Sequence, residues 1–267
     1  MQTLRFKRAS LTVLLFTFLS VAFISCGKDD DDVPVVPAPE STVVSAAGDI
    51  TAALAQFRGI LGDQLNTTPN QTTGRREVNW DGVPANFTNS DNFPFDFFNL
   101  TDPNGSNGRK RGLVYANNGT FFRVDSSDFS DIEPSYGTQF DAFSGKRSFT
   151  PRGSNIADLF FKVPGTNADA SIKGFGVVFS DVDDANSTSI EFFNGNKSLG
   201  VFKAPVRQPG SSFSFIGVFF PKEKITRVKI IAGNSILAVG NKDVSDNGQY
   251  DLVVMDDMFY TEPLINN

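Results

Sequence analysis

The 267-residue chain contains no histidine and only one cysteine. Without histidine there is no Ser-His-Asp triad, no Cys-His pair and no histidine-ligated zinc or iron. Catalysis would have to rely on carboxylates, Lys, Tyr or Ser, and a metal would need oxygen ligands, which indicates calcium or magnesium. A glycoside hydrolase that uses two carboxylates remains compatible with this composition. No catalytic signature is present, however, so we expect a protein that is not an enzyme.

Basic residues are scarce in most of the chain. Three of the 24 basic side chains lie in the first 25 residues, whereas all 30 acidic side chains follow them, so the rest of the chain carries a net charge of about −9. A negative net charge without a basic stripe repels polyanions. We therefore exclude nucleic acid and the anionic face of a membrane as partners.

The only cysteine, Cys26, ends an apolar segment. Arg5, Lys7 and Arg8 precede fourteen uncharged residues, 11–24, and a positive head before a short apolar run is typical of a secretory signal peptide. The run is shorter than the roughly 20 residues of a membrane-spanning helix. Its end resembles a bacterial lipobox, which implies that Cys26 receives a diacylglyceryl group. The alternative is an ordinary secretory signal with an incidental cysteine.

The segment after Cys26 is acidic and then rich in proline. Four aspartates occupy 29–32, and Pro34, Pro37 and Pro39 follow; such stretches favour an extended, solvated chain. An acidic block directly after a lipidated cysteine resembles the surface-export signal of Bacteroidetes lipoproteins, although it could also be a solubilising spacer.

The N-terminal signals together predict three parts of the chain. These are a lipoprotein signal peptide over 1–25, a tether over 26–44 and a folded domain over 45–267. The resemblance implies a location at the outer membrane, with a lipid anchor and with the domain facing the cell exterior.

The sequence of the folded domain predicts an all-β structure. Its many phenylalanines (28 in the chain) favour strands. Apolar residues spaced three and four apart predict one amphipathic helix within 45–62. Short runs with strand character, separated by turn-rich pieces, are found at 75–80, 111–115, 120–124, 139–144, 157–163, 171–182, 187–193, 211–220, 225–232 and 250–260. This spacing predicts a single antiparallel β-sandwich, jelly-roll-like, with an N-terminal helix.

Several short motifs recur in a fixed order. They include WDGVP (80–84), GFGVVFSDVD (174–183) and VVMDDMFY (253–260). In this order they resemble a family of uncharacterised secreted bacterial domains with jelly-roll sandwiches. The resemblance implies the fold and no established activity.

Two groups of aspartates are candidates for a cation site. Asp181 and Asp183 follow a strong strand, and Asp256 and Asp257 interrupt an apolar one. Burying adjacent acids without a partner is costly, so something must offset their charge. If the strands bring these four residues together, their oxygens would suit a structural calcium ion. The alternative is a charge-paired strand and a solvated acidic turn.

The single tryptophan, Trp80, is a candidate for stacking against a sugar, although a lone tryptophan beside a Gly-Val-Pro turn more often packs in a core. We therefore predict a surface-exposed, lipid-anchored module of the binding or adhesion type, with an extracellular glycan or another cell-surface polymer as its partner. Two alternatives remain open, namely a structural interaction domain of the cell envelope without a small ligand, and a carboxylate-based glycoside hydrolase.

Overall fold

The computed structural model describes residues 38–116 and 121–266. The predicted signal peptide, Cys26 and the predicted tether up to residue 37 lie outside the described residues. Within them, no helix is both long enough and apolar enough to cross a membrane.

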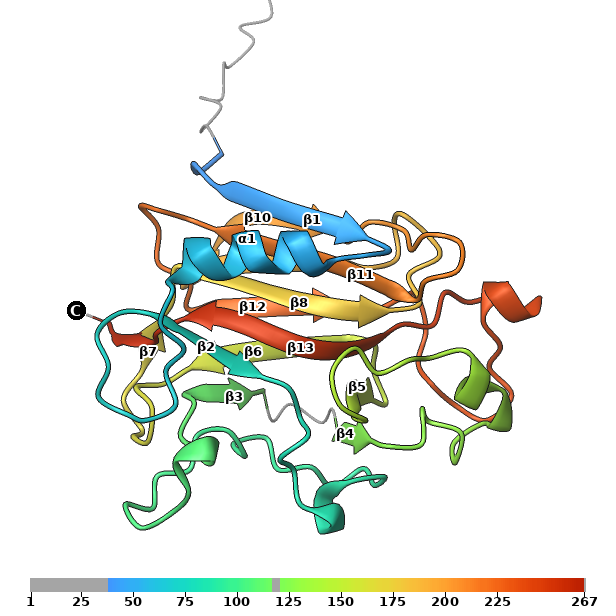
Figure 1. Ribbon diagram of the computed structural model, residues 1–267, viewed down its shortest axis with the longest axis horizontal. Coiled ribbons are helices and arrows are strands. Elements are labelled where there is room, and N and C mark those ends of the chain that lie inside the picture. Colours follow the sequence, from blue (N-terminus) through green and yellow to red (C-terminus); the bar gives the residue numbers. More distant parts are fainter. Residues whose placement is uncertain (1–37, 117–120, 267) are drawn as a thin grey trace, which may run out of the picture. The chain divides into compact units, whose positions relative to one another are not determined.

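The described chain forms two large sheets and one small one (Figure 1). The seven-stranded sheet has the order β1 (Thr42–Ala47), β11 (Phe213–Phe219), β8 (Gly174–Ser180), β13 (Val254–Thr261), β5 (Ser148–Arg152) and β4 (Phe121–Asp125), and β2 (Arg75–Val78) also pairs with β13. The five-stranded sheet has the order β10 (Lys197–Lys203), β9 (Ser189–Asn194), β12 (Arg227–Ile231), β6 (Ile156–Phe161) and β3 (Leu113–Tyr115). The small sheet pairs β14 (Leu264–Ile265) with β7 (Ala170–Ser171).

Neighbouring strands run antiparallel throughout these sheets. One α-helix, α1 (Thr51–Leu61), accompanies them. Short 3₁₀ helices occupy Ala85–Phe87, Asn107–Arg109, Pro134–Thr138 and Val244–Asp246.

The main core lies between the two large sheets. Phe175, Val177 and Phe179 of β8 join the same buried cluster as Val228 and Ile230 of β12. In each strand the alternate residues point inward, as the two-residue period of a strand requires. The predicted all-β antiparallel sandwich with one N-terminal helix is confirmed.

Helix α1 covers the outer face of the seven-stranded sheet, as Figure 1 shows. Its Phe57 is fully buried and packs edge-on against Phe215 at 5.5 Å between ring centroids. The ring lies over Gly176 and Gly217, where an added Cβ would come within 2.7 Å of it. These two glycines therefore leave the space that lets the helix sit close to the sheet.

The N-terminal element differs from the prediction in two respects. Residues 42–44, which we assigned to the tether, belong to the edge strand β1 and pair with β11. Residues 45–47, which we expected in the helix, belong to the edge strand β1, and Ser45 faces Ile216 of β11. Gly48, at φ 85°, then turns the chain, and an oxygen of Asp49 accepts the backbone N–H of Thr51 at 3.0 Å. The helical spacing of the apolar residues holds only from Ile50 onward, because the residues before it pair with the sheet.

Several segments were assigned incorrectly from their patterns, and the strand β10 at Lys197–Lys203 was not expected at all. The run 139–144 forms no strand, since Phe140 instead packs with Phe129 and Tyr136 in a separate buried cluster. Strand β5 was not expected, because Pro151 and the arginine after it weaken the strand pattern. β5 lies between β13 and β4, so its partners, rather than its own sequence, give it strand geometry.

Two glycine substitutions test how α1 sits on the sheet. Gly217→Ala should destabilise the fold by about 1–3 kcal/mol, because its methyl group would overlap the Phe57 ring. Gly59→Ala, on the exposed side of α1 with open space around the added Cβ, should stabilise it by roughly 0.5–1 kcal/mol. Urea denaturation of both variants would measure this, and an unchanged midpoint for Gly217→Ala would contradict the packing described.

Candidate functional site

The outer face of the five-stranded sheet is open to solvent. Its outward residues are half-buried or exposed along β6, β12 and β10, while their neighbours in sequence are mostly buried in the core. In Figure 1 these strands lie behind the seven-stranded sheet, on the side away from α1. Of the two outer faces, the one without a covering helix is therefore the one that can meet a large ligand.

Four residues form a row across this face, which we call the transverse strip. Val114, Phe160, Arg227 and Phe193 stand at facing positions on β3, β6, β12 and β9. Phe160 is 37% exposed. The guanidinium carbon of Arg227 lies 3.6 Å from the centroid of the Phe193 ring, a cation–π contact that leaves this ring only 9% exposed.

A charged row lies beside the transverse strip, one step further along the strands. It consists of Asp158, Lys229 and Glu191, again at facing positions. Asp158 joins the two rows, because its Oδ1 lies 2.8 Å from Nη1 of Arg227. Arg227 is thus fixed from below by a ring and from the side by a carboxylate.

The middle of the strip, at Phe160 and Arg227, borders a hollow of about 770 Å³. Phe160, Arg227 and Asp158 line it from the sheet. Asn196, Thr226, Asp169 and Asn266 are further lining residues, which supply amide, hydroxyl and carboxylate groups. A concave site of a few hundred Å³ with apolar walls and a few polar groups is typical of small-molecule and oligomer recognition.

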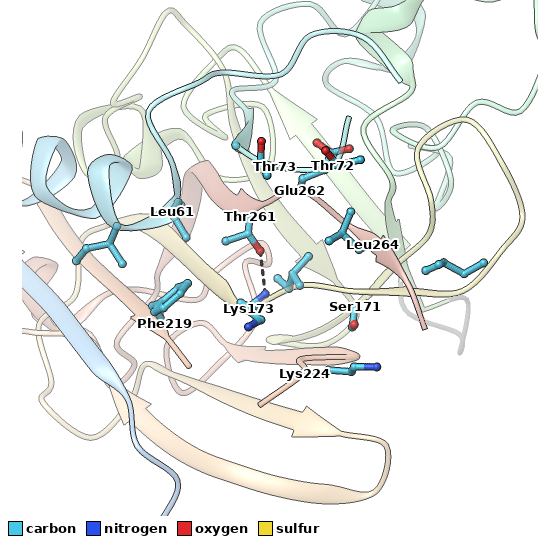
Figure 2. A pocket seen from close by; sticks show the side chains of 14 residues that line it. Leu61, Thr72, Thr73, Ser171, Lys173, Phe219, Lys224, Thr261, Glu262 and Leu264 are labelled. Atoms are coloured by element: carbon cyan, nitrogen blue, oxygen red, sulfur yellow. Dashed lines mark hydrogen bonds between the residues drawn. The ribbon is translucent and has the colours of Figure 1, made fainter. Parts of the chain in front are cut away.

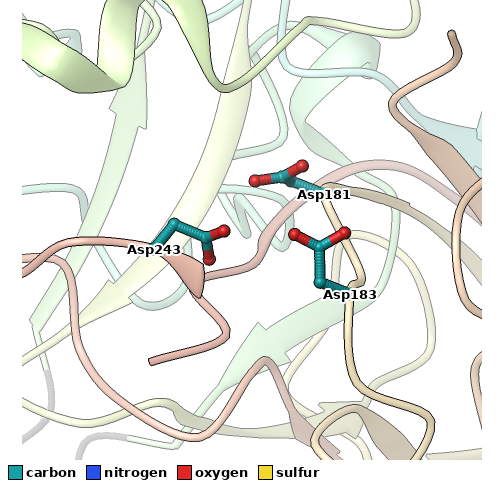
Figure 3. Close-up of side chains that lie close together, drawn as sticks. All are labelled: Asp181, Asp183 and Asp243. Carbon is teal, nitrogen blue, oxygen red and sulfur yellow. The ribbon is translucent and has the colours of Figure 1, made fainter. Parts of the chain in front are cut away.

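A second feature is a group of three carboxylates at the end of β8. Oxygens of Asp181, Asp183 and Asp243 all lie within 4.8 Å of one another, and Figure 3 shows their carboxylates turned toward a common space. Asp181 leaves the strand in the left-handed region, at φ 72°. The group could hold a metal ion.

The charge of this group is only partly offset. Nε of Arg207 lies 2.7 Å from Oδ1 of Asp181 and 2.7 Å from Oδ1 of Asp183, while Oδ2 of Asp181 is buried without a hydrogen-bond partner. Burial, followed by the charge of Asp243, raises the pKa of Asp181 to about 7. Burial also raises the pKa of Asp243, despite the two backbone N–H groups that its carboxylate accepts.

Asp251 supports this loop from the side. Its carboxylate accepts the backbone N–H groups of Asp183 and Asp184, each at 3.0 Å, and the hydroxyl of Ser187. Sequence reasoning did not select Asp243 or Asp251. Both occur in polar, turn-rich stretches whose only signal is composition, and the turn at 241–252 that brings Asp243 to Asp181 was not predictable from local pattern.

Asp256 and Asp257 are not members of the three-carboxylate group. They lie within β13, where Oδ2 of Asp256 accepts the backbone N–H groups of Phe143 and Ser144 and Asp257 accepts the Ser144 hydroxyl. Burial and the charge of Asp257 raise the pKa of Asp256 to about 9, and burial raises the pKa of Asp257 too. Through these hydrogen bonds the pair holds the backbone at 143–144.

Trp80 lies in the core. Its indole is 1% exposed, stacks on Phe149 at 4.2 Å between ring centroids, and donates Nε1–H to the carbonyl of Asp256 at 3.2 Å. A ring so enclosed offers no face to a sugar, so the packing interpretation fits the structure. The exposed aromatic side chain of the open face is instead Phe160, which sequence reasoning did not single out because its run looked like any buried strand.

Another hollow, of about 600 Å³, lies where α1 ends near β7 and β14 (Figure 2). Its walls are mainly aliphatic and include Leu61, Ile172 and Leu264. The polar groups there are already engaged, because Glu262 pairs with the buried Arg76 and Nζ of Lys173 donates to the carbonyl of Pro221. The aromatic residue in its lining, Phe219, is less exposed than Phe160 of the open face.

Comparison with known proteins gives little guidance. No protein-family model and no curated protein matches the chain. Two solved structures, both variants of a family 29 carbohydrate-binding module, are 10% identical to it. They cover 46% of this chain and 75% and 74% of the module, each with a TM-score of 0.24. A TM-score this low assigns neither a topology nor a ligand.

The raised pKa of Asp256 predicts how stability depends on pH. Between the ordinary pKa of 3.8 and about 9, Asp256 binds its proton more fully in the folded chain than in the unfolded chain. The contribution of Asp256 to the free energy of unfolding therefore falls as pH rises. Asp256→Asn, which stays neutral, should therefore gain stability over the wild type at pH 8 more than at pH 5. Urea denaturation at both pH values would measure this, with Asp169→Asn, at an exposed carboxylate, as the control; equal gains at the two pH values would contradict it.

Proposed function

We propose that this protein is a non-catalytic, surface-anchored module that binds glycan on the outer face of its five-stranded sheet. The observation that carries the proposal is the exposed Phe160 beside the fixed Arg227–Asp158 pair, at the mouth of a hollow of about 770 Å³. Sugar rings present flat C–H faces and hydroxyl edges. An aromatic ring can stack on the faces, and fixed amide, carboxylate and guanidinium groups can bind the edges.

The same geometry favours binding over hydrolysis. A glycoside hydrolase needs one carboxyl that donates a proton and a second carboxylate across the sugar. The two carboxylates that line the hollow are both ion-paired, Asp158 with Arg227 and Asp169 with Lys162 at 2.5 Å. The described residues that line the hollow therefore do not include the pair of unpaired carboxyl groups that hydrolysis needs.

A glycan array with the purified protein tests the proposal, followed by affinity measurements on any glycan retained. Phe160→Ala should weaken binding roughly tenfold or more, as truncation of a central aromatic contact does. The matched control is Phe121→Ala, at a phenylalanine 62% exposed on the other sheet, which should bind as the wild type does. Absence of binding to every glycan on the array would instead favour a structural interaction domain of the cell envelope.

We also propose that the Asp181, Asp183 and Asp243 group takes a structural calcium ion. Three carboxylates face one guanidinium, so two negative charges remain to be offset when all are ionised. The orphaned Oδ2 of Asp181 supplies an oxygen ligand that the protein itself does not satisfy. Calcium accepts such clustered carboxylates, with carbonyl groups and water completing its six to eight ligands.

Thermal melting with calcium and with a chelator tests this second proposal. Calcium should raise the melting temperature by several degrees, because it binds only the folded chain. Asp243→Asn should abolish the shift, and Asp184→Asn, at an exposed acid outside the group, should keep it. An identical melting temperature for the wild type in the two buffers would contradict the proposed calcium site.

The anchoring of the module is proposed from the sequence alone. A diacylglyceryl group on Cys26 would hold the protein at the outer membrane, since two acyl chains give stable attachment, and the acidic segment after it supports exposure at the cell surface. Cys26→Ser should move the protein from the membrane fraction to the soluble fraction. Mass spectrometry of the native protein that found a free thiol at this position would contradict the proposal.

A further inference from the structure

The transverse strip has the form of a linear track. Its four members come from four adjacent strands, β3, β6, β12 and β9, in one register. Adjacent strands lie about 4.8 Å apart, so three intervals give a track of about 14 Å perpendicular to the strands. A track of this length accommodates several consecutive sugar rings rather than one.

The track presents an aliphatic side chain, an aromatic ring and a planar guanidinium, and its borders are polar. Val114, Phe160 and the guanidinium of Arg227 form its upper layer, because Arg227 covers Phe193. The charged row with Lys229 and Glu191 runs along one border. The hollow, with Asn196 and Thr226, lies at the other border. This arrangement matches an extended chain whose ring faces rest on the track and whose hydroxyl groups point to both sides.

The charges around the track are balanced by the protein itself. Arg227 pairs with Asp158, Lys162 pairs with Asp169, and a further pair joins Lys197 to Glu223 at 3.3 Å. Lys229 stands between two carboxylates in register, Asp158 on one side and Glu191 on the other. A carboxylated or sulfated sugar would meet these acids as well as the long-range field of a chain with an overall net charge of −6.

We infer that the ligand is an uncharged, extended polysaccharide that lies across β3, β6, β12 and β9. This inference rests on the proposed function and narrows its ligand class. Anionic glycans are disfavoured because Arg227, Lys162 and Lys197 each already have a carboxylate beside them. Monosaccharides and disaccharides are disfavoured because they cover only part of the track.

The test compares neutral polysaccharides with polyuronates and sulfated glycans, by affinity electrophoresis and calorimetry on the full chain. The neutral polymers should bind, with affinity unchanged within about twofold between low and high salt, because no net charge is neutralised. For a neutral ligand that binds, affinity should rise with chain length until the track is covered. Lys229→Ala should leave the binding of a neutral polymer independent of salt, whereas it would weaken the binding of a polyanion and reduce its salt dependence.

The possible outcomes distinguish a failure of this inference from a failure of the proposed function. Salt-sensitive binding of a polyuronate or sulfated glycan, lost in Phe160→Ala, would overturn the uncharged class and keep glycan binding at this face. A monosaccharide bound as tightly as its polymer would overturn the extended track. Absence of binding to every glycan, with the protein folded by circular dichroism, would overturn both the inference and the proposed function.

Discussion

The close packing of Phe57 against the seven-stranded sheet is the constraint on which the rest of this structure depends. A sheet has two faces, and both apolar faces of this one must be buried. The core between the sheets buries one of them, and α1 buries the other, because Gly176 and Gly217 give the Phe57 ring room to lie directly on the backbone. Glycines in a strand interior weaken it, so their presence in β8 and β11 is explained by the helix they admit.

That asymmetry leaves the five-stranded sheet with the open face. Its outward residues alternate with the core residues behind them, so the same strands that close the sandwich also carry Phe160, Arg227 and Asp158 outward. A rigid sheet holds these side chains at fixed spacing, which lowers the entropy lost when a ligand binds. The binding that we propose at this sheet face therefore rests on the way the fold distributes its covering elements.

The buried acidic side chains have three different kinds of partner. Asp256 and Asp257 hold a neighbouring backbone segment, Glu262 pairs with the buried Arg76, and Asp181, Asp183 and Asp243 converge with a single guanidinium among them. Asp181 and Asp256 each keep a buried carboxylate oxygen without a hydrogen-bond partner, but of these two only Asp181 lies in a group of three carboxylates. Composition alone treats these aspartates alike, and their partners distinguish them.

The sequence by itself determined the class of fold, the helix after Ile50 and most strands, because alternation and helical spacing are local consequences of burying one face. It also excluded histidine chemistry outright. It could not place Asp243 beside Asp181, bury Trp80 or make 139–144 a loop, since those depend on which distant segments meet. Strand β5, with its proline, and edge strand β1 likewise acquire their geometry from neighbours. Only the tertiary structure decided which sheet face stays open, because that depends on where α1 packs, and α1 packs over Gly176 and Gly217.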